Sequence, residues 1–81
     1  KEEAMRLVDA VYNRMIEIID KQKTTVYAVA KNGCVPCSTI ATMTRSKTVT
    51  LATIYGICLG LKISLKEFFD SPLFEEINIT D

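Results

Sequence analysis

Apolar side chains recur every three or four residues along the first quarter of this 81-residue chain. This spacing places them on one face of an amphipathic helix, because about 3.6 residues make one helical turn. It predicts a helix over about residues 3–20 that buries one side. The members of the stripe are Met5, Val8, Val11, Tyr12, Met15, Ile16 and Ile19.

Two short helices are predicted next, over about residues 26–32 and 36–45. Thr24 or Thr25 can cap the first of them, since a threonine hydroxyl accepts from a backbone N–H that lacks a helical partner. Asn32-Gly33 is the most flexible break in the chain, and Pro36 suits the first turn of the following helix. The side chains expected to face the core are Val26, Val29, Ala30, Ile40 and Met43.

A fourth helix is predicted over about residues 51–59, with Thr50 as its cap and Gly60 as its terminator. A fifth helix over about 64–70 begins with Ser64-Leu65-Lys66-Glu67, which has the spacing of a capping box. The side chains expected to be buried on the fourth helix are Leu51, Ile54, Ile57 and Cys58.

The chain is expected to be a single all-α domain of five helices spanning residues 1–81, because this length allows one modest core. Residues 71–81 form an acidic tail, in which 77–80 alternate like a weak strand. The longest apolar runs are too short to span a membrane, and the charged N-terminus lacks the pattern of a signal peptide. We therefore expect a cytoplasmic protein without membrane contact.

Charge is unevenly distributed, although the formal net charge is zero. Residues 21–66 carry seven basic and no acidic side chains, whereas residues 1–20 sum to −2 and residues 67–81 to −5. Such polarisation can present one positive face to a polyanion. It is equally compatible with chance clustering on a solvated surface.

Residues 26–45 resemble the helix-turn-helix motif of the lambda-repressor-like, Cro/cI-type family of bacterial and phage regulators. With Val26 as the first motif residue, the apolar and turn positions of the family fall on Ala30, Cys34, Val35, Ile40 and Met43. The similarity continues through 47–51, 54–59 and 63–69, so that it covers roughly residues 9–70.

Several positions differ from the usual family pattern. Cys34 replaces the usual turn glycine, so that the positive φ angle must fall on Cys34 or on Gly33. Val26 and Cys37 stand where the family often carries glutamine, and Thr44-Arg45-Ser46 replaces its usual Glu-any-Gly.

The resemblance implies a sequence-specific DNA-binding transcriptional regulator, more narrowly a repressor, that places about residues 37–45 in the major groove of duplex DNA. It also implies a homodimer, for which the first helix and 73–79 are candidate surfaces. The residues expected to contact DNA are Thr24, Thr25, Tyr27, Cys37, Ser38, Thr39, Thr42, Arg45 and Lys47. Other roles remain open: helix capping for Thr24 and Ser38, core packing for Tyr27, and simple solvent exposure for Lys47.

Cys34-Val35-Pro36-Cys37 has the C-x-x-C spacing of zinc sites and dithiol enzymes. The chain has no histidine and only one further cysteine, Cys58, which lies in a helical apolar stripe. We therefore expect no metal or other cofactor. A redox switch is a hypothesis, since a cysteine near a helix N-terminus can have a lowered pKa. The simpler interpretation is a turn residue at Cys34, an exposed helix start at Cys37 and a buried Cys58.

Enzymatic activity is not expected, because histidine, the commonest base for a nucleophile, is missing from the sequence and no glycine-rich phosphate loop occurs. No small-molecule ligand is evident either. The alternative function is that of a protein-interaction or antitoxin-like module with weak or no DNA binding of its own. The missing glutamines favour this alternative, and the acid-free segment 21–66 opposes it.

Overall fold

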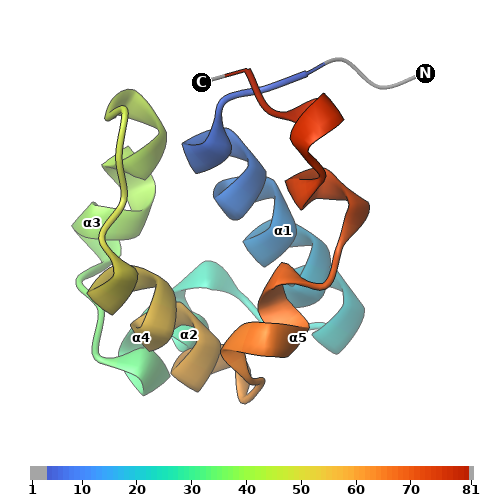
Figure 1. The fold of residues 1–81 in the computed structure, drawn as a ribbon. Coiled ribbons are helices and arrows are strands. Elements are labelled where there is room, and N and C mark those ends of the chain that lie inside the picture. The colour runs from blue at the N-terminus through green and yellow to red at the C-terminus, as the bar shows by residue number, and fades with distance from the viewer. Residues whose placement is uncertain (1–3, 81) are drawn as a thin grey trace.

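The computed structural model describes residues 4–80, which form five α-helices and three short 3-10 helices (Figure 1). The α-helices are α1 (Leu7–Gln22), α2 (Val26–Gly33), α3 (Cys37–Thr42), α4 (Leu51–Leu61) and α5 (Leu65–Phe69). The 3-10 helices are η1 (Met43–Arg45), η2 (Pro72–Phe74) and η3 (Glu76–Asn78). The all-α prediction is confirmed, and the predicted helices agree with the observed ones to within a few residues.

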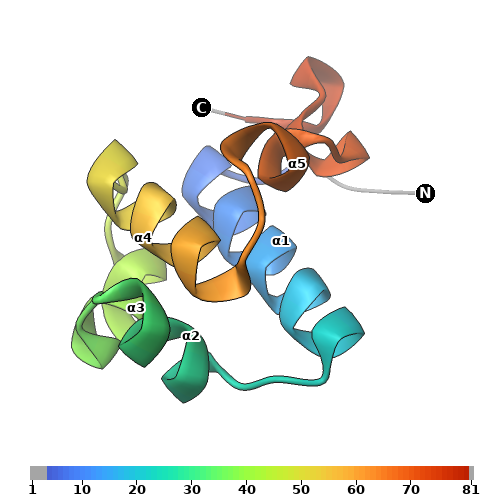
Figure 2. The same cartoon turned by 90° about the horizontal axis from the view of Figure 1, so that it is seen from below.

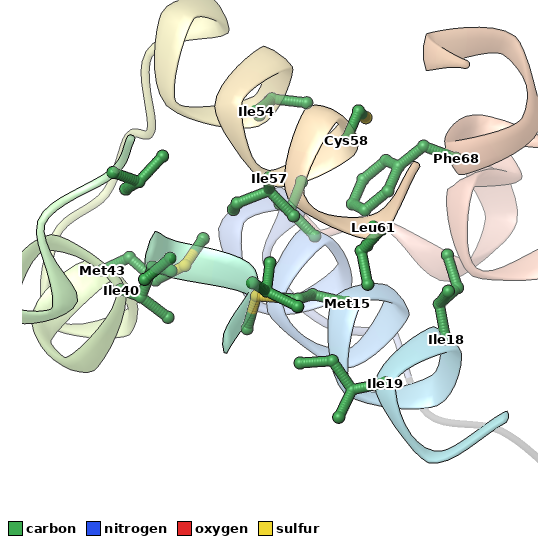
Figure 3. Packing of buried hydrophobic residues seen from close by; sticks show 14 of the residues in the cluster. Met15, Ile18, Ile19, Ile40, Met43, Ile54, Ile57, Cys58, Leu61 and Phe68 are labelled. Carbon is green, nitrogen blue, oxygen red and sulfur yellow. The ribbon is translucent and has the colours of Figure 1, made fainter. Parts of the chain in front are cut away.

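Helix α1 runs through the middle of the molecule in both views (Figures 1 and 2). Helices α2, α3 and α4 lie on one side of it, and α5 with η2 and η3 lies on the other. Ile57 and Leu61 of α4 are fully buried together with Met15 of α1, and Phe68 of α5 closes the core beside Leu61 (Figure 3).

Leu51 is an exception to the predicted burial pattern of α4. Its side chain is 78% exposed, while Ile54, Ile57 and Cys58 are buried as expected. Leu51 is the first residue of α4 and lies one turn before Ile54, so that the apolar stripe of this helix extends beyond the core that it covers.

Helices α2 and α4 approach closely because three glycines lie where they meet. A Cβ atom added to Gly33 would overlap the carbonyl oxygen of Gly56, and one added to Gly60 would overlap the carbonyl oxygen of Val29. At Gly56, an added Cβ would overlap the side chain of Val35 in the turn after α2. The prediction that Gly60 ends the helix is therefore wrong: Gly60 lies inside α4 and serves close packing.

Helices α1, α2 and α4 end instead on left-handed residues that are not glycine: Lys23, Cys34 and Lys62, with φ angles of 59°, 58° and 61°. At each end, two backbone N–H groups turn back onto carbonyls of the last helical turn, as in a Schellman motif. Non-glycine residues in this conformation carry a steric cost, because Cβ crowds the backbone.

Other helix boundaries also differ from the predictions. Pro36 lies at the N-cap of α3 rather than in its first turn, and the α-helix ends at Thr42, where the last predicted turn becomes η1. The Ser64 hydroxyl accepts from the N–H of Glu67 at 3.0 Å, which is the first half of the predicted capping box.

At the two ends of the chain, the predictions hold only in part. The predicted start of the first helix at residue 3 lies outside the described residues, and α1 begins at Leu7. In place of the weak strand, residues 4–80 contain a single isolated bridge between Met5 and Ile79.

Long polar side chains on and just before α1 bind the backbone carbonyls of other elements. Arg14 donates to the carbonyl oxygens of Phe68 (2.7 Å) and Glu67 (2.8 Å), at the end of α5. Gln22 donates to the carbonyl oxygen of Leu61 at 2.8 Å, at the end of α4. These bonds satisfy the carbonyls of Phe68 and Leu61 and add a second donor to that of Glu67, which also accepts from the N–H of Asp70.

We expect Gly60→Ala to lower the free energy of unfolding by at least about 2 kcal/mol, because the new methyl group overlaps backbone that cannot move easily. Alanine would otherwise stabilise a helix interior by about 1 kcal/mol relative to glycine. Urea denaturation measures the change. Ala52→Gly, at an exposed position of the same helix, is the control and should cost only about 1 kcal/mol. Equal or greater stability of Gly60→Ala would contradict the close approach.

Lys62→Gly should have the opposite effect and stabilise the fold by about 1 kcal/mol, because glycine adopts the left-handed conformation without a Cβ clash. Lys31→Gly, at an exposed right-handed position of α2, should instead destabilise it by about 1 kcal/mol. Thermal and urea unfolding of both variants test the prediction. A loss of stability in Lys62→Gly would be incompatible with the assigned backbone conformation.

Candidate nucleic-acid interface

The turn between α2 and α3 takes its positive φ angle at Cys34, not at Gly33. The N–H of Cys34 donates to the carbonyl of Lys31 at 3.3 Å, and that of Val35 donates to Ala30 at 2.9 Å. Val35 is buried and lies against Gly56 of α4. The turn is thus fixed at its two ends, by α2 on one side and by α4 on the other.

Helix α3 has a buried and an exposed face. Ile40 is fully buried and Met43 follows it into the core from η1 (Figure 3). The exposed side chains are small and uncharged: Cys37, Ser38, Ala41 and Thr42. The hydroxyl of Thr42 donates to the carbonyl of Ser38 at 2.8 Å, which leaves its oxygen lone pairs facing outward as acceptors.

The three predicted contact residues at the start of α2 have different environments. The hydroxyl of Thr25 accepts from the N–H of Ala28 at 3.1 Å, so Thr25 is the N-cap of α2. Thr24 is half-buried, and its N–H donates to the carbonyl of Ile19. Tyr27 is 66% exposed, which contradicts a core-packing role and leaves its ring and hydroxyl available on the surface.

Arg45 and Lys47, the two basic candidates after α3, are both exposed. Arg6 holds the backbone around Arg45, because its guanidinium donates to the carbonyl oxygens of Thr44 (2.6 Å) and Ser46 (3.4 Å). The carboxylate of Asp9 pairs with the same guanidinium at 2.9 Å. The end of η1 and the loop after it, which carry these two basic side chains, are therefore tied to the start of α1.

Hydroxyl side chains beyond the predicted set surround the end of α3. Thr39, which is half-buried, and Thr42 share a shallow hollow with Ser46, Thr48 and Thr53. Eight of the sixteen residues from 38 to 53 are serine or threonine, a density from which the hollow could have been anticipated. Thr50, also in the hollow, caps α4 by accepting from the N–H of Thr53 at 3.1 Å.

The cysteines occupy the places expected from the simpler interpretation. Cys34 lies in the turn, Cys37 begins α3, and both are exposed, whereas Cys58 is buried. Burial raises the pKa of the Cys58 thiol above its ordinary value. Within residues 4–80, no group of three or more His, Cys, Asp or Glu side chains could hold a metal ion.

Thiol labelling should distinguish the three cysteines. We expect two thiols per chain to react rapidly with a disulfide reagent under native conditions, and Cys58 to react only on unfolding. Cys58→Ala should leave the rapid reaction at two thiols. Three rapid thiols would contradict the assigned burial.

Because burial raises the pKa of the Cys58 thiol, the neutral thiol stabilises the fold at a pH below the unfolded-state pKa. This stabilisation is lost as the pH rises through the folded-state pKa.

Comparisons with family models, with curated proteins and with solved structures found no match to the chain. Among the described residues, no helix combines the length and the apolar character needed to cross a membrane.

Proposed function

We propose that this protein binds duplex DNA through α2 and α3 and acts as a sequence-specific transcriptional regulator of the lambda-repressor-like type, more narrowly a repressor. The observation that carries the proposal is the exposed face of α3. Its small side chains, Cys37, Ser38, Ala41 and Thr42, leave the backbone of a helix free to approach the floor of a major groove.

The side chains on this face can form hydrogen bonds and methyl contacts with the edges of bases. Serine and threonine hydroxyls donate to or accept from several bases, and the methyl groups of Ala41 and Thr42 can contact the methyl group of thymine. Ile40 of α3 and Met43 of η1 are buried in the core, so that the outer face of α3 is presented rigidly. We propose that Cys37, Ser38, Thr39 and Thr42 lie nearest the bases.

The surrounding residues supply contacts to phosphate. Arg45 is exposed at the end of η1, and Lys47 follows it in the loop. Tyr27 stands in the first turn of α2, where the helix dipole also favours an anion, with Thr24 and Thr25 beside it. No acidic side chain interrupts residues 21–66, so phosphate meets no repulsion from this segment.

Fluorescence anisotropy with a nonspecific duplex at two salt concentrations tests the proposal. We expect measurable affinity that falls steeply with salt, because each neutralised phosphate releases a counterion. Arg45→Gln should weaken binding and reduce the slope of log K against log salt by about one. Lys66→Gln is the matched control, since Lys66 is an exposed basic residue on α5 and should change neither value.

Two results would contradict the proposal. An absence of binding at low salt would eliminate the proposal in favour of a protein-interaction module. Equal effects of Arg45→Gln and Lys66→Gln would show that binding does not use the α3 side of the molecule. Selection from random duplexes then measures whether binding is sequence-specific.

A further inference from the structure

Helix α4 contains no charged residue over its eleven positions, although four of its residues, Leu51, Ala52, Tyr55 and Leu59, are exposed. Leu51, Tyr55 and Leu59 are 78%, 53% and 50% exposed. Their spacing of four residues places them in one stripe along the outer side of the helix. A solvated helix of a small domain normally carries charged side chains on this side, so the stripe requires an explanation.

The stripe leads into an apolar groove of about 490 Å³ at the start of α4. Leu51 lines this groove together with Leu7 of α1 and Phe69 of α5, which are themselves partly exposed. Lys47 is the single charged side chain among the lining residues. We define the α4 surface as the stripe Leu51, Tyr55 and Leu59 with the groove residues Leu7 and Phe69.

We propose that the α4 surface is the interface through which two copies of this chain associate. The five side chains expose on the order of 500 Å² of mostly apolar area. Each partner in a standard-size interface buries roughly 800 Å², of which about two thirds is apolar in homodimers. Complete burial of the five side chains would therefore supply about the apolar share of one partner in such an interface.

The occupant is a second copy because the surface complements itself. A two-fold axis brings the same patch of both subunits together, so that an apolar, uncharged stripe meets another one. A charged partner would find no complementary group on α4. The net charge of zero also means that two copies do not repel each other overall.

The α4 surface is not one of the two dimer surfaces expected from the sequence, which were the first helix and residues 73–79. Phe74 of the tail packs against the core, and η2 lies along α1, which covers part of that helix. Ile77 is the one large apolar side chain of residues 71–80 that is mostly exposed, at 83%. In Figure 2, α3 and α5 lie on opposite sides of α4, and none of the five residues of the α4 surface belongs to α2 or α3.

This proposal does not rest on DNA binding, and its test uses the protein without DNA. Sedimentation equilibrium of the full chain from about 1 to 500 μM should show a reversible monomer–dimer equilibrium. Leu51→Glu should raise the dissociation constant of the dimer more than about tenfold, because symmetry brings two carboxylates into an apolar interface. Glutamate at the first position of a helix is favourable, so the monomer should remain folded, as circular dichroism would show.

Ile77→Glu is the matched control, because it places the same charge at an equally exposed apolar position outside the α4 surface. Its dissociation constant should stay within about twofold of the parent value. Tyr55→Lys provides a second variant and should weaken the dimer as Leu51→Glu does. A monomeric parent at 500 μM would overturn the proposal. An undiminished dimer in both α4 variants, or equal dissociation by Ile77→Glu, would overturn it as well.

Discussion

The close approach of α2 to α4 determines where the rest of the molecule lies. It depends on Gly33, Gly56 and Gly60, none of which leaves room for a Cβ atom. Because Val35 of the turn rests against Gly56, the turn and then α3 are placed by the same contact. A larger side chain at any of these positions would therefore disturb the placement of α3 as well as the core.

Hydrogen bonds from side chains of the α1 region to backbone carbonyls also hold η1, α5 and α4 in place. Arg6, Arg14 and Gln22 reach from the α1 region to η1, α5 and α4, respectively. Each guanidinium also pairs with a carboxylate three residues further along the chain, Asp9 or Glu17. Helix α1 thus joins the two sides of the molecule by polar contacts at its margins as well as by its apolar stripe.

The sequence predicted the helices well because apolar spacing and caps are local properties. Thr25, Thr50 and Ser64 cap the helices that they were expected to cap. The prediction that Gly60 ends the fourth helix was wrong, because the sequence alone does not distinguish a glycine that ends a helix from one that permits close packing against another helix. The prediction that Leu51 is buried failed for a related reason, since periodicity identifies an apolar stripe but not its covered length.

For the candidate interface, Cys37, Ser38 and Thr42 were expected on the outer face of α3 and are exposed, whereas the sequence left exposure and packing open for Tyr27. That choice depends on where the start of α2 lies relative to α1, which is a tertiary property. The hydroxyl hollow beside α3 was missed because its members come from three elements. The α4 surface was missed because exposure of an apolar stripe cannot be seen in its spacing.

The two faces of α3 differ in how well they tolerate substitution. Ile40 and Met43 maintain the fold, whereas Cys37, Ser38, Ala41 and Thr42 touch solvent and contribute little to the core. The outer positions can therefore diverge rapidly among descendants of this chain without loss of folding. Under the proposed function, a substitution at one of these positions would alter the binding preference without altering the scaffold.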